Sequence, residues 1–307
     1  IVLPSYNESK NIQNAYIEIK EVLSKEKIPF ELVYVNDGSK DDTWTKIEEI
    51  IEKGKAELKQ SRIRGVSFSR NFGKEAAILA GLANATGEAC VVMDCDMQHP
   101  PETLVEMYRL WQEGYEVVEG VKRTRGKESL VYKSSAKLFY RLMSKATGID
   151  MSRASDFKLM DRKVVKSILS MPERNMFFRG LSSWVGFKKT EVEFDVRERE
   201  FGTSKWSKWS LVKYAVKNIA AFSTVPMQLV TIAGALTLLG AVILGIQTLI
   251  RYFSGHAVQG FTTVILLLLI IGSVIMMSLG IMGYYLAKIY EEVKRRPVYI
   301  ISEVKES

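Results

Sequence analysis

Two carboxylates one residue apart, Asp94 and Asp96, are the residues in this sequence that point most directly to chemistry. They follow an apolar run typical of a buried strand, and Pro100-Pro101 stops any continuation of that strand. Carboxylates at positions i and i+2 of an extended chain project from the same face, so both can reach one hard cation. Gln98 adds a neutral oxygen two positions further on. The stretch predicts a site for Mg²⁺ or Mn²⁺, and the alternative is a strand that ends in an acidic turn.

The elements that must position these carboxylates alternate between short apolar runs and longer helical segments. Strands are predicted near residues 1–5, 30–35, 64–68, 91–93 and 116–121, and helices near 9–27, 43–57, 76–85 and 104–113. This alternation predicts an α/β fold with a Rossmann-like, mostly parallel sheet. The loops at the carboxyl ends of such strands gather at one edge, where ligands bind. Further on, residues 155–162 introduce another helix, and residues 191–200 alternate as a strand does.

Two other loops at strand ends carry polar groups. The turn that contains Asp37 and Gly38 allows a close approach of the backbone, and its carboxylate can accept hydrogen bonds from a base or a ribose. The loop before the next helix supplies Arg70 and Lys74. Taken singly, these are an ordinary turn and a solvated basic face. Their recurrence at successive strand ends suits a nucleotide diphosphate bound with a divalent cation.

Four cations lie within residues 122–127, directly after a predicted strand, and they include Arg123 and Arg125. A solvated loop is the alternative to an anion site there. The net charge of +8 also fits nucleic acid, an anionic membrane or a phosphorylated substrate. No zinc finger or aromatic RNA-binding signature accompanies the charge, so we expect no nucleic-acid partner. Cys90 and Cys95 are at odd spacing, on opposite faces, which fits reduced thiols in the cytosol.

Two segments, 225–250 and 261–287, are long and apolar enough to span a bilayer, and Arg251 is the only formally charged residue from Val225 to Ala287. At about 1.5 Å per residue, 26 residues of helix exceed a hydrocarbon core of about 30 Å. Lysines and arginines precede the first span and follow the second, so residues 1–207 and the tail 288–307 are expected to be cytoplasmic, with 251–260 as an external loop.

Two further helices are expected to lie against the membrane surface. Residues 130–147 combine apolar and basic positions, with core packing as the alternative, and residues 208–224 form a juxtamembrane amphipathic helix. We expect an integral protein of the inner or plasma membrane, with the lipid bilayer as a partner. The glycines of the spans and a strand-like tail at 297–301 favour a homo-oligomer, with a tetramer as one form, and the tail strand is a candidate for pairing with another subunit.

With these motifs placed, the chain resembles the family 2 inverting glycosyltransferases, specifically the membrane-anchored polyprenyl-phosphate glycosyltransferases akin to dolichyl-phosphate mannose and glucose synthases. The resemblance covers residues 1 to about 225, and two C-terminal spans follow as in the bacterial polyprenyl-phosphate glucosyltransferases. The matching stretches are Pro4-Ser5-Tyr6-Asn7-Glu8, Asn36-Asp37-Gly38-Ser39, residues 69–75, residues 93–101, Asp156-Phe157-Lys158-Leu159, Arg179-Gly180-Leu181 and Ser204-Lys205-Trp206-Ser207. Asn36 stands where many members have Asp, and Ser155 where Gly is frequent.

The resemblance implies a GT-A fold and roles for individual residues. Asp96 and Gln98 would hold the metal, with Asp94 contacting the metal shell, ribose or sugar, and Asp156 occupies the position usually proposed as the base. The nucleoside pocket would be formed by Pro4, Tyr6, Glu8 and Asp37. Candidates for binding the diphosphate or the lipid phosphate are Arg123, Arg125, Arg199, Ser204 and Lys205.

The expected activity is the inverting transfer of one hexose, best glucose from UDP-glucose, to a polyprenyl phosphate at the cytoplasmic membrane face. The signature Gln-X-X-Arg-Trp of processive polysaccharide synthases is absent from the sequence, which indicates one sugar per lipid. A GDP-mannose-dependent polyprenyl-phosphate mannosyltransferase and a noncatalytic nucleotide-sugar-sensing membrane protein are the alternatives.

Overall fold

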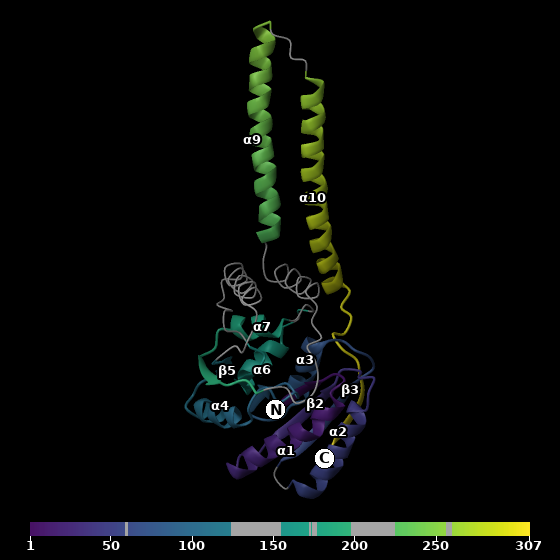
Figure 1. Ribbon diagram of the computed structural model, residues 1–307, viewed down its shortest axis with the longest axis vertical. Helices are drawn as coiled ribbons and strands as arrows, with labels where there is room; N and C mark the ends of the chain where they lie inside the picture. The colour runs from purple at the N-terminus through teal and green to yellow at the C-terminus, as the bar shows by residue number, and fades with distance from the viewer. Residues whose placement is uncertain (59–60, 124–154, 172, 174–176, 198–224, 256–259) are drawn as a thin grey trace. The chain divides into compact units, whose positions relative to one another are not determined.

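A computed structural model describes residues 1–58, 61–123, 155–171, 173, 177–197, 225–255 and 260–307 (Figure 1). The chain divides into two compact units. The first contains Ile1–Ser207 together with Pro297–Ser307, and the second contains Lys208–Arg296. The C-terminal residues therefore belong to the same unit as the N-terminal α/β domain.

In the described residues of the first unit, eight strands form one sheet in the order β7-β5-β6-β4-β1-β2-β3-β8. The strands are β1 (Val2–Ser5), β2 (Glu31–Asn36), β3 (Arg62–Phe68), β4 (Ala89–Val92), β5 (Val117–Lys122), β6 (Lys158–Asp161), β7 (Lys189–Phe194) and β8 (Ile301–Glu306). β1 pairs in parallel with β2 and β4, and the β2–β3 and β5–β7 pairs are also parallel. The mostly parallel α/β fold predicted from the sequence is confirmed.

Helices cover both faces of this sheet. They are α1 (Ser9–Lys25), α2 (Thr43–Glu57), α3 (Lys74–Asn84), α4 (Glu102–Gln112), α6 (Arg162–Leu169) and α7 (Phe178–Trp184). One core cluster joins α1, α2 and α4 to strand residues such as Leu3 and Tyr34, and a second joins α3, α6 and α7 to Val2 and Val35. Adjacent strand residues contribute to opposite clusters because side chains alternate across a strand. The central strands are buried on both faces, which explains their nearly continuous apolar sequences.

The segment around Asp156 contains a strand that sequence analysis did not predict. β6 runs antiparallel to both β4 and β5 and lies between them, and only then does α6 begin at Arg162. Four residues give too short a pattern to distinguish a strand from the start of the helix that follows. β6 matters for the site because it places Asp156, two residues before its start, beside the end of β4.

The tail differs from its prediction. The strand β8 begins at Ile301, where the predicted strand ended, and it pairs antiparallel with β3 of the same chain (Figure 1). The expectation that the tail pairs with another subunit is therefore wrong for this structure. β8 covers the backbone groups of β3 that an edge strand would otherwise expose.

The second unit contains two long helices that lie side by side, α9 (Val225–Phe253) and α10 (Phe261–Val293) (Figure 1). By length and composition, Met227–Arg251 and Leu267–Val293 can cross a membrane, and their side chains are exposed. Hydroxyl groups in both helices, such as Thr237 and Ser278, donate to the carbonyl four residues earlier, which satisfies them inside the helix. A Cβ added at the helix glycines would meet open space, so these glycines do not mark a contact between α9 and α10.

Candidate active site

The polar loops gather where β1 and β4 lie side by side. From β1 the sheet continues through β2 and β3 in one direction and through β4 in the other. The loop after β1 leads into α1, and the loop after β4 leads into α4, which packs against β5 and β6 on the other side of β4. Ligands of open α/β sheets bind at the carboxyl ends of the strands where the strand order changes direction in this way. Cys95 Sγ lies 3.1 Å from Ser5 Oγ, which anchors the loop after β4 to the end of β1.

The loop after β4 carries the paired carboxylates, although β4 itself ends at Val92, earlier than predicted. Asp94 and Asp96 lie in a turn in which Met97 adopts a positive φ of 55°. The predicted alternation nevertheless holds, because Met93, Cys95 and Met97 are buried while Asp94, Asp96 and Gln98 are partly exposed. The three oxygen-bearing side chains therefore share the solvent side of the loop.

This donor set fits a hard divalent cation only in part. Within the described residues, no group of three or more His, Cys, Asp or Glu side chains is placed to hold a metal ion. Two carboxylates and one amide oxygen leave about half of the positions of an octahedral Mg²⁺ shell to other ligands. A cation here would need oxygens from a bound diphosphate to complete its coordination.

Lys74, the first residue of α3, connects the loop after β4 to the segment before β6. Its ammonium lies 2.7 Å from an Asp94 oxygen and 3.1 Å from Asp156 Oδ2. Burial alone would lower the pKa of this lysine, but the two carboxylates outweigh it and raise the pKa above its ordinary value. Lys74 is therefore a fixed positive charge between two carboxylates that lie 62 residues apart in sequence.

Asp156 forms a second, bidentate ion pair. Arg179 of α7 donates from Nε to Oδ1 (2.7 Å) and from Nη2 to Oδ2 (2.9 Å). Burial would raise the pKa of Asp156, but Lys74 and Arg179 lower it well below its usual range. A carboxylate held so firmly in its ionised form has little tendency to take up a proton. The geometry suits orientation of two cations better than general-base catalysis.

Glu75, next to Lys74, fixes the start of α7. Its Oε2 accepts the backbone N–H of Phe178 at 2.9 Å. Burial, followed by the negative charge of Asp156, raises the pKa of Glu75 to about 7. The helix that carries Arg179 is thus tied to the helix that carries Lys74.

A buried ion pair lies beneath these residues. Lys158, which is 1% exposed, donates to Glu119 (3.0 Å) and to Ser182 of α7 (2.7 Å). Glu119 also accepts the backbone N–H of Ser155, beside Asp156. Burial lowers the pKa of Lys158, and Glu119 opposes that shift. The pair connects the segment that carries Asp156 to α7, so it supports the geometry of the Asp156–Arg179 ion pair.

Asp37, at the end of β2, is bound by neutral donors. The backbone N–H groups of Phe72 and Gly73 donate to its two carboxylate oxygens at 2.6 and 2.9 Å, and Asn71 Nδ2 donates at 3.0 Å. Burial raises the pKa of Asp37, and the two N–H groups oppose that shift. The carboxylate is 3% exposed, so its observed role is to hold the loop at residues 69–73. Oδ2 already accepts two of these hydrogen bonds, and Oδ1 retains capacity for a second one.

Gly38 is required by this close approach. A Cβ at Gly38 would lie 2.3 Å from the carbonyl carbon of Arg70, and the residue has a φ of +60°. The loop after β1 is bound to the same region, because Asn7 N–H donates to Ser39 Oγ (3.0 Å) and Glu8 N–H donates to Thr43 Oγ1 (2.9 Å). The structure thus brings the segment that contains Pro4, Tyr6 and Glu8 beside the Asp37 turn.

Comparisons with known proteins show the family to which the chain belongs. The sequence model of the family described as Glycosyl transferase family 2 matches residues 1–169. An uncharacterized glycosyltransferase of Synechocystis is 39% identical over 99% of this chain and 94% of its own length.

The chain belongs to glycosyl transferase family 2.

Other full-length relatives have more informative names. A prophage bactoprenol glucosyl transferase homolog of Escherichia coli K12 is 35% identical over 99% of this chain and 98% of its own length. The bactoprenol glucosyl transferase of Shigella phage SfII is 34% identical over 99% and 97%. Among solved structures, the mannosyltransferase PcManGT from Pyrobaculum calidifontis in complex with GDP-Man and Mn²⁺ is 16% identical, covering 90% of this chain and 85% of that chain with a TM-score of 0.45.

The predicted basic residues of this glycosyltransferase are only partly brought together. Lys74 joins the carboxylate cluster, whereas Arg70 places its guanidinium over the Phe72 ring, 4.2 Å from the centroid. Arg123 pairs with Asp195 (3.2 Å) and Glu193 (3.7 Å) at the outer strand β7. Arg125, Arg199, Ser204 and Lys205 lie outside the described residues, as do the predicted helices at 130–147 and 208–224.

The sequence patterns assigned no role to Arg179, Glu75 or Asn71. Arg179 and Asn71 donate to the predicted site residues Asp156 and Asp37, and the charge of Asp156 raises the pKa of Glu75. All three lie inside stretches quoted for the family resemblance. Their position in those stretches was the available signal. Their partners could not be read from the sequence because they come from loops far apart in the chain.

Proposed function

We propose that this glycosyltransferase transfers a single hexose, best glucose from UDP-glucose, to a polyprenyl phosphate at the cytoplasmic face of the membrane, with inversion at the anomeric carbon. The observation that carries the proposal is the bridge by Lys74 between Asp94 and Asp156. It connects the donor-side loop to a bidentate Asp–Arg pair that is suited to a second anionic substrate. Two exposed apolar helices and the full-length similarity to bactoprenol glucosyl transferases support a lipid acceptor.

In the proposed reaction, an oxygen of the acceptor phosphate attacks the anomeric carbon of the sugar. The bond from that carbon to the β-phosphate oxygen breaks, and UDP leaves with the bonding electron pair. A phosphate monoester has a second pKa near about 6, so the attacking oxygen is already deprotonated at neutral pH. The low pKa of Asp156 agrees with a reaction that needs no protein base. Asp156 would instead hold Lys74 and Arg179 in position for the phosphates.

The metal requirement belongs to this proposal as well. Asp96 and Gln98, with Asp94 beside them, would hold Mg²⁺ or Mn²⁺ on the diphosphate. A bound divalent cation would supply positive charge that stabilises the departing UDP. The turn at Asp37, with Pro4, Tyr6 and Glu8 beside it, would receive the nucleoside. Arg70 and Arg123, and Arg125, Arg199, Ser204 and Lys205 in the segments that are not described, stay candidates for the phosphates.

The proposed orientation follows from the charge pattern and the chain path. Lys205, Lys208, Lys213 and Lys217 precede α9, and Lys288, Lys294, Arg295 and Arg296 lie at or after the end of α10. By the positive-inside rule both ends of the helix pair would be cytoplasmic. The chain path supports this orientation, because residues 1–207 of the catalytic unit precede the helix pair and residues 297–307 of the same unit follow it.

The test is release of the nucleoside diphosphate from several UDP-sugars and from GDP-mannose, measured with and without undecaprenyl phosphate and with Mg²⁺ or Mn²⁺. We expect UDP-glucose to give the fastest lipid-dependent release. Faster release from GDP-mannose would favour the mannosyltransferase alternative. If no donor gives lipid-dependent release, the catalytic proposal is wrong, and nucleotide binding alone would favour a sensing protein. Asp96→Ala is the inactive control.

A further inference from the structure

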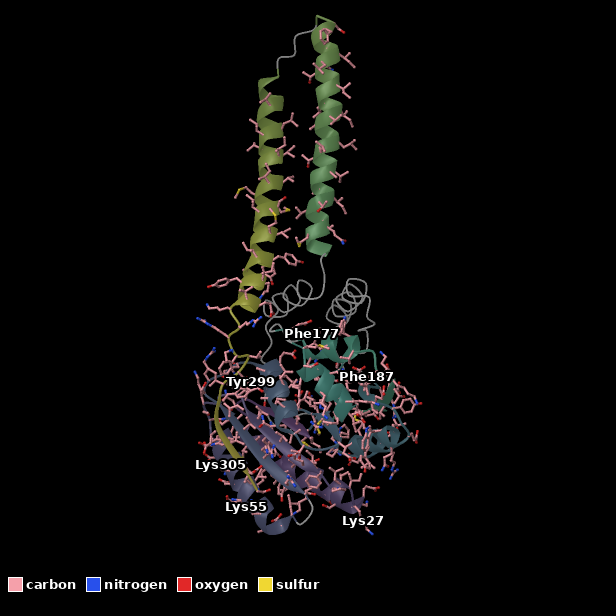
Figure 2. The ribbon with its side chains drawn as sticks, turned by 180° about the vertical axis from the view of Figure 1, so that it is seen from behind. Lys27, Lys55, Phe177, Phe187, Tyr299 and Lys305 are labelled. Atoms are coloured by element: carbon pink, nitrogen blue, oxygen red, sulfur yellow. The ribbon has the colours of Figure 1, made fainter. Side chains whose placement is uncertain are left out.

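The tail strand β8 and the two residues before it contact the end of β3 and the start of the loop at residues 69–73. Ile300 C=O accepts the backbone N–H of Ser69 at 3.1 Å, and Ser302 Oγ donates to the carbonyl of Ser67 at 3.0 Å. The Tyr299 ring stacks on Phe68, with centroids 5.1 Å apart and planes within 10°. Figure 2 labels Tyr299 and Lys305 along this C-terminal segment. The tail thus holds the last residues of β3 and the first residue of the loop at 69–73.

A series of direct contacts connects Tyr299 to Asp37 through Phe68 and Phe72. Phe68 packs edge-on against Phe72, with centroids 5.7 Å apart. The backbone N–H of Phe72 donates to Asp37 Oδ1. The Arg70 guanidinium lies over the Phe72 ring. The backbone of Arg70 lies so close to Gly38 that a side chain at Gly38 would collide with it. A shift of the Phe68 and Phe72 rings would therefore displace the N–H groups that fix Asp37.

We propose that Tyr299 is a positioning residue for nucleotide binding: its ring and the adjacent Ile300 carbonyl hold the loop at 69–73 so that Asp37 and its turn keep the shape that receives the nucleoside. The proposal rests on the donor half of the proposed function. It assigns to the C-terminal segment, which follows α10 after residues 294–298, a role in the donor site in addition to completing the sheet. Tyr299 itself touches no substrate.

The experiment measures binding of UDP and of GDP, each with Mn²⁺, to the full chain purified in detergent. The variants are Tyr299→Ala, Tyr299→Phe and Val304→Ala, and the last removes a 47% exposed side chain of β8 as a matched control. We expect Tyr299→Ala to raise the dissociation constant of the more tightly bound nucleotide by roughly 3- to 10-fold. This range corresponds to the free energy that one aromatic pair contributes. Tyr299→Phe keeps the stacked ring and should bind as the unchanged chain does, and so should Val304→Ala.

A purely structural role would give a different result. In that case Tyr299→Ala would lower the melting temperature while nucleotide affinity stayed within twofold of the unchanged chain, and the proposal would be overturned. Should Tyr299→Ala fail to fold, Tyr299→Leu keeps an apolar side chain without the stacked ring, and the same affinity criterion applies to it. With active protein, the KM for the sugar donor should rise while the KM for the polyprenyl phosphate stays unchanged.

The outcomes also separate this inference from the proposed function. If the unchanged chain binds UDP and Tyr299→Ala binds it equally well, only the inference fails. If the unchanged chain binds UDP but shows no lipid-dependent release, the catalytic proposal fails while the positioning role of Tyr299 stands or falls on affinity. If neither nucleotide binds, both fail.

Discussion

Asp37 and Asp156 are both mostly buried aspartates at the same edge of the sheet, but their surroundings are opposite. Asp37 accepts hydrogen bonds from neutral donors, and burial raises its pKa. Asp156 is held by two cations, which outweigh burial and lower its pKa. The difference teaches that one residue type can be held in two opposite electrostatic environments at one edge of the sheet. Asp37 is held by neutral hydrogen-bond donors, and Asp156 lies in a fixed array of charges, which suit the proposed nucleoside and phosphate sites respectively.

The largest effect is expected when one of the two cations beside Asp156 is removed. Arg179→Ala leaves Asp156 with Lys74 alone, so Lys74 would be drawn away from Asp94. We expect turnover to fall by about 10²- to 10³-fold, the usual loss when one preorganised charged donor is removed. Steady-state rates of UDP release measure it. Arg109→Ala removes an exposed pair with Glu26 and should leave turnover unchanged. Turnover within threefold for Arg179→Ala would contradict the charged-array interpretation.

The second variant tests the shape of the turn at Asp37 and Gly38 and leaves its charge unchanged. Gly38 has a positive φ, and the Cβ of Gly38→Ala would collide with the backbone of Arg70. The control Gly186→Ala has a similar φ of +70°, but its Cβ would lie 3.9 Å from the nearest atom. Both variants should lose about 1–2 kcal/mol from the left-handed backbone alone. Gly38→Ala should lose more and should also bind UDP more weakly. Melting temperature and UDP affinity measure the two effects, and equal losses in the two variants would show that the loop contact is not needed.

The smallest expected effect concerns Glu75, whose pKa is raised to about 7 by burial and by the charge of Asp156. The folded protein holds this proton more tightly than the unfolded chain does, so stability should fall as the pH rises from about 5 to above 7. Glu75→Gln cannot ionise and keeps an acceptor for the Phe178 N–H. Its melting temperature should therefore exceed that of the unchanged chain more at pH 8 than at pH 5. Glu49→Gln at an exposed pair is the control, and parallel pH curves for Glu75→Gln and the unchanged chain would refute the prediction.

The fold could be predicted because it rests on patterns local to the chain. The apolar runs of β1 to β5 and the boundaries of α2 followed from strand and helix periodicity. The strand β6 was missed because its four residues continue directly into α6. The tail at 297–301 was a candidate for pairing with another subunit, and the pairing of β8 with β3 was not predicted because no local pattern specifies which edge a strand will pair with.

The candidate site was predictable as a set of strand-end loops but not as a set of contacts. That Asp94 and Lys74 lie at one edge of the sheet followed from the order of strands and loops. The bridge from Lys74 to Asp156 and the bidentate pair with Arg179 did not follow, because they join three segments through β6 and α7. The hydrogen bonds between Asp37 and the loop at residues 69–73 could not be predicted either. A carboxylate followed by a glycine is equally typical of a turn that faces a ligand.

The sheet is assembled from both ends of the chain, and this has a consequence for biosynthesis. The ribosome completes β3 long before it makes β8, and both apolar helices are synthesised between them. Until the last residues emerge, β3 is an open edge with unpaired backbone groups, which favours association with other chains. A soluble fragment that stops before α9 would keep that edge permanently open. A fragment in which a flexible linker joins residue 207 directly to residue 297 would close it, and is the better choice for producing the catalytic unit alone.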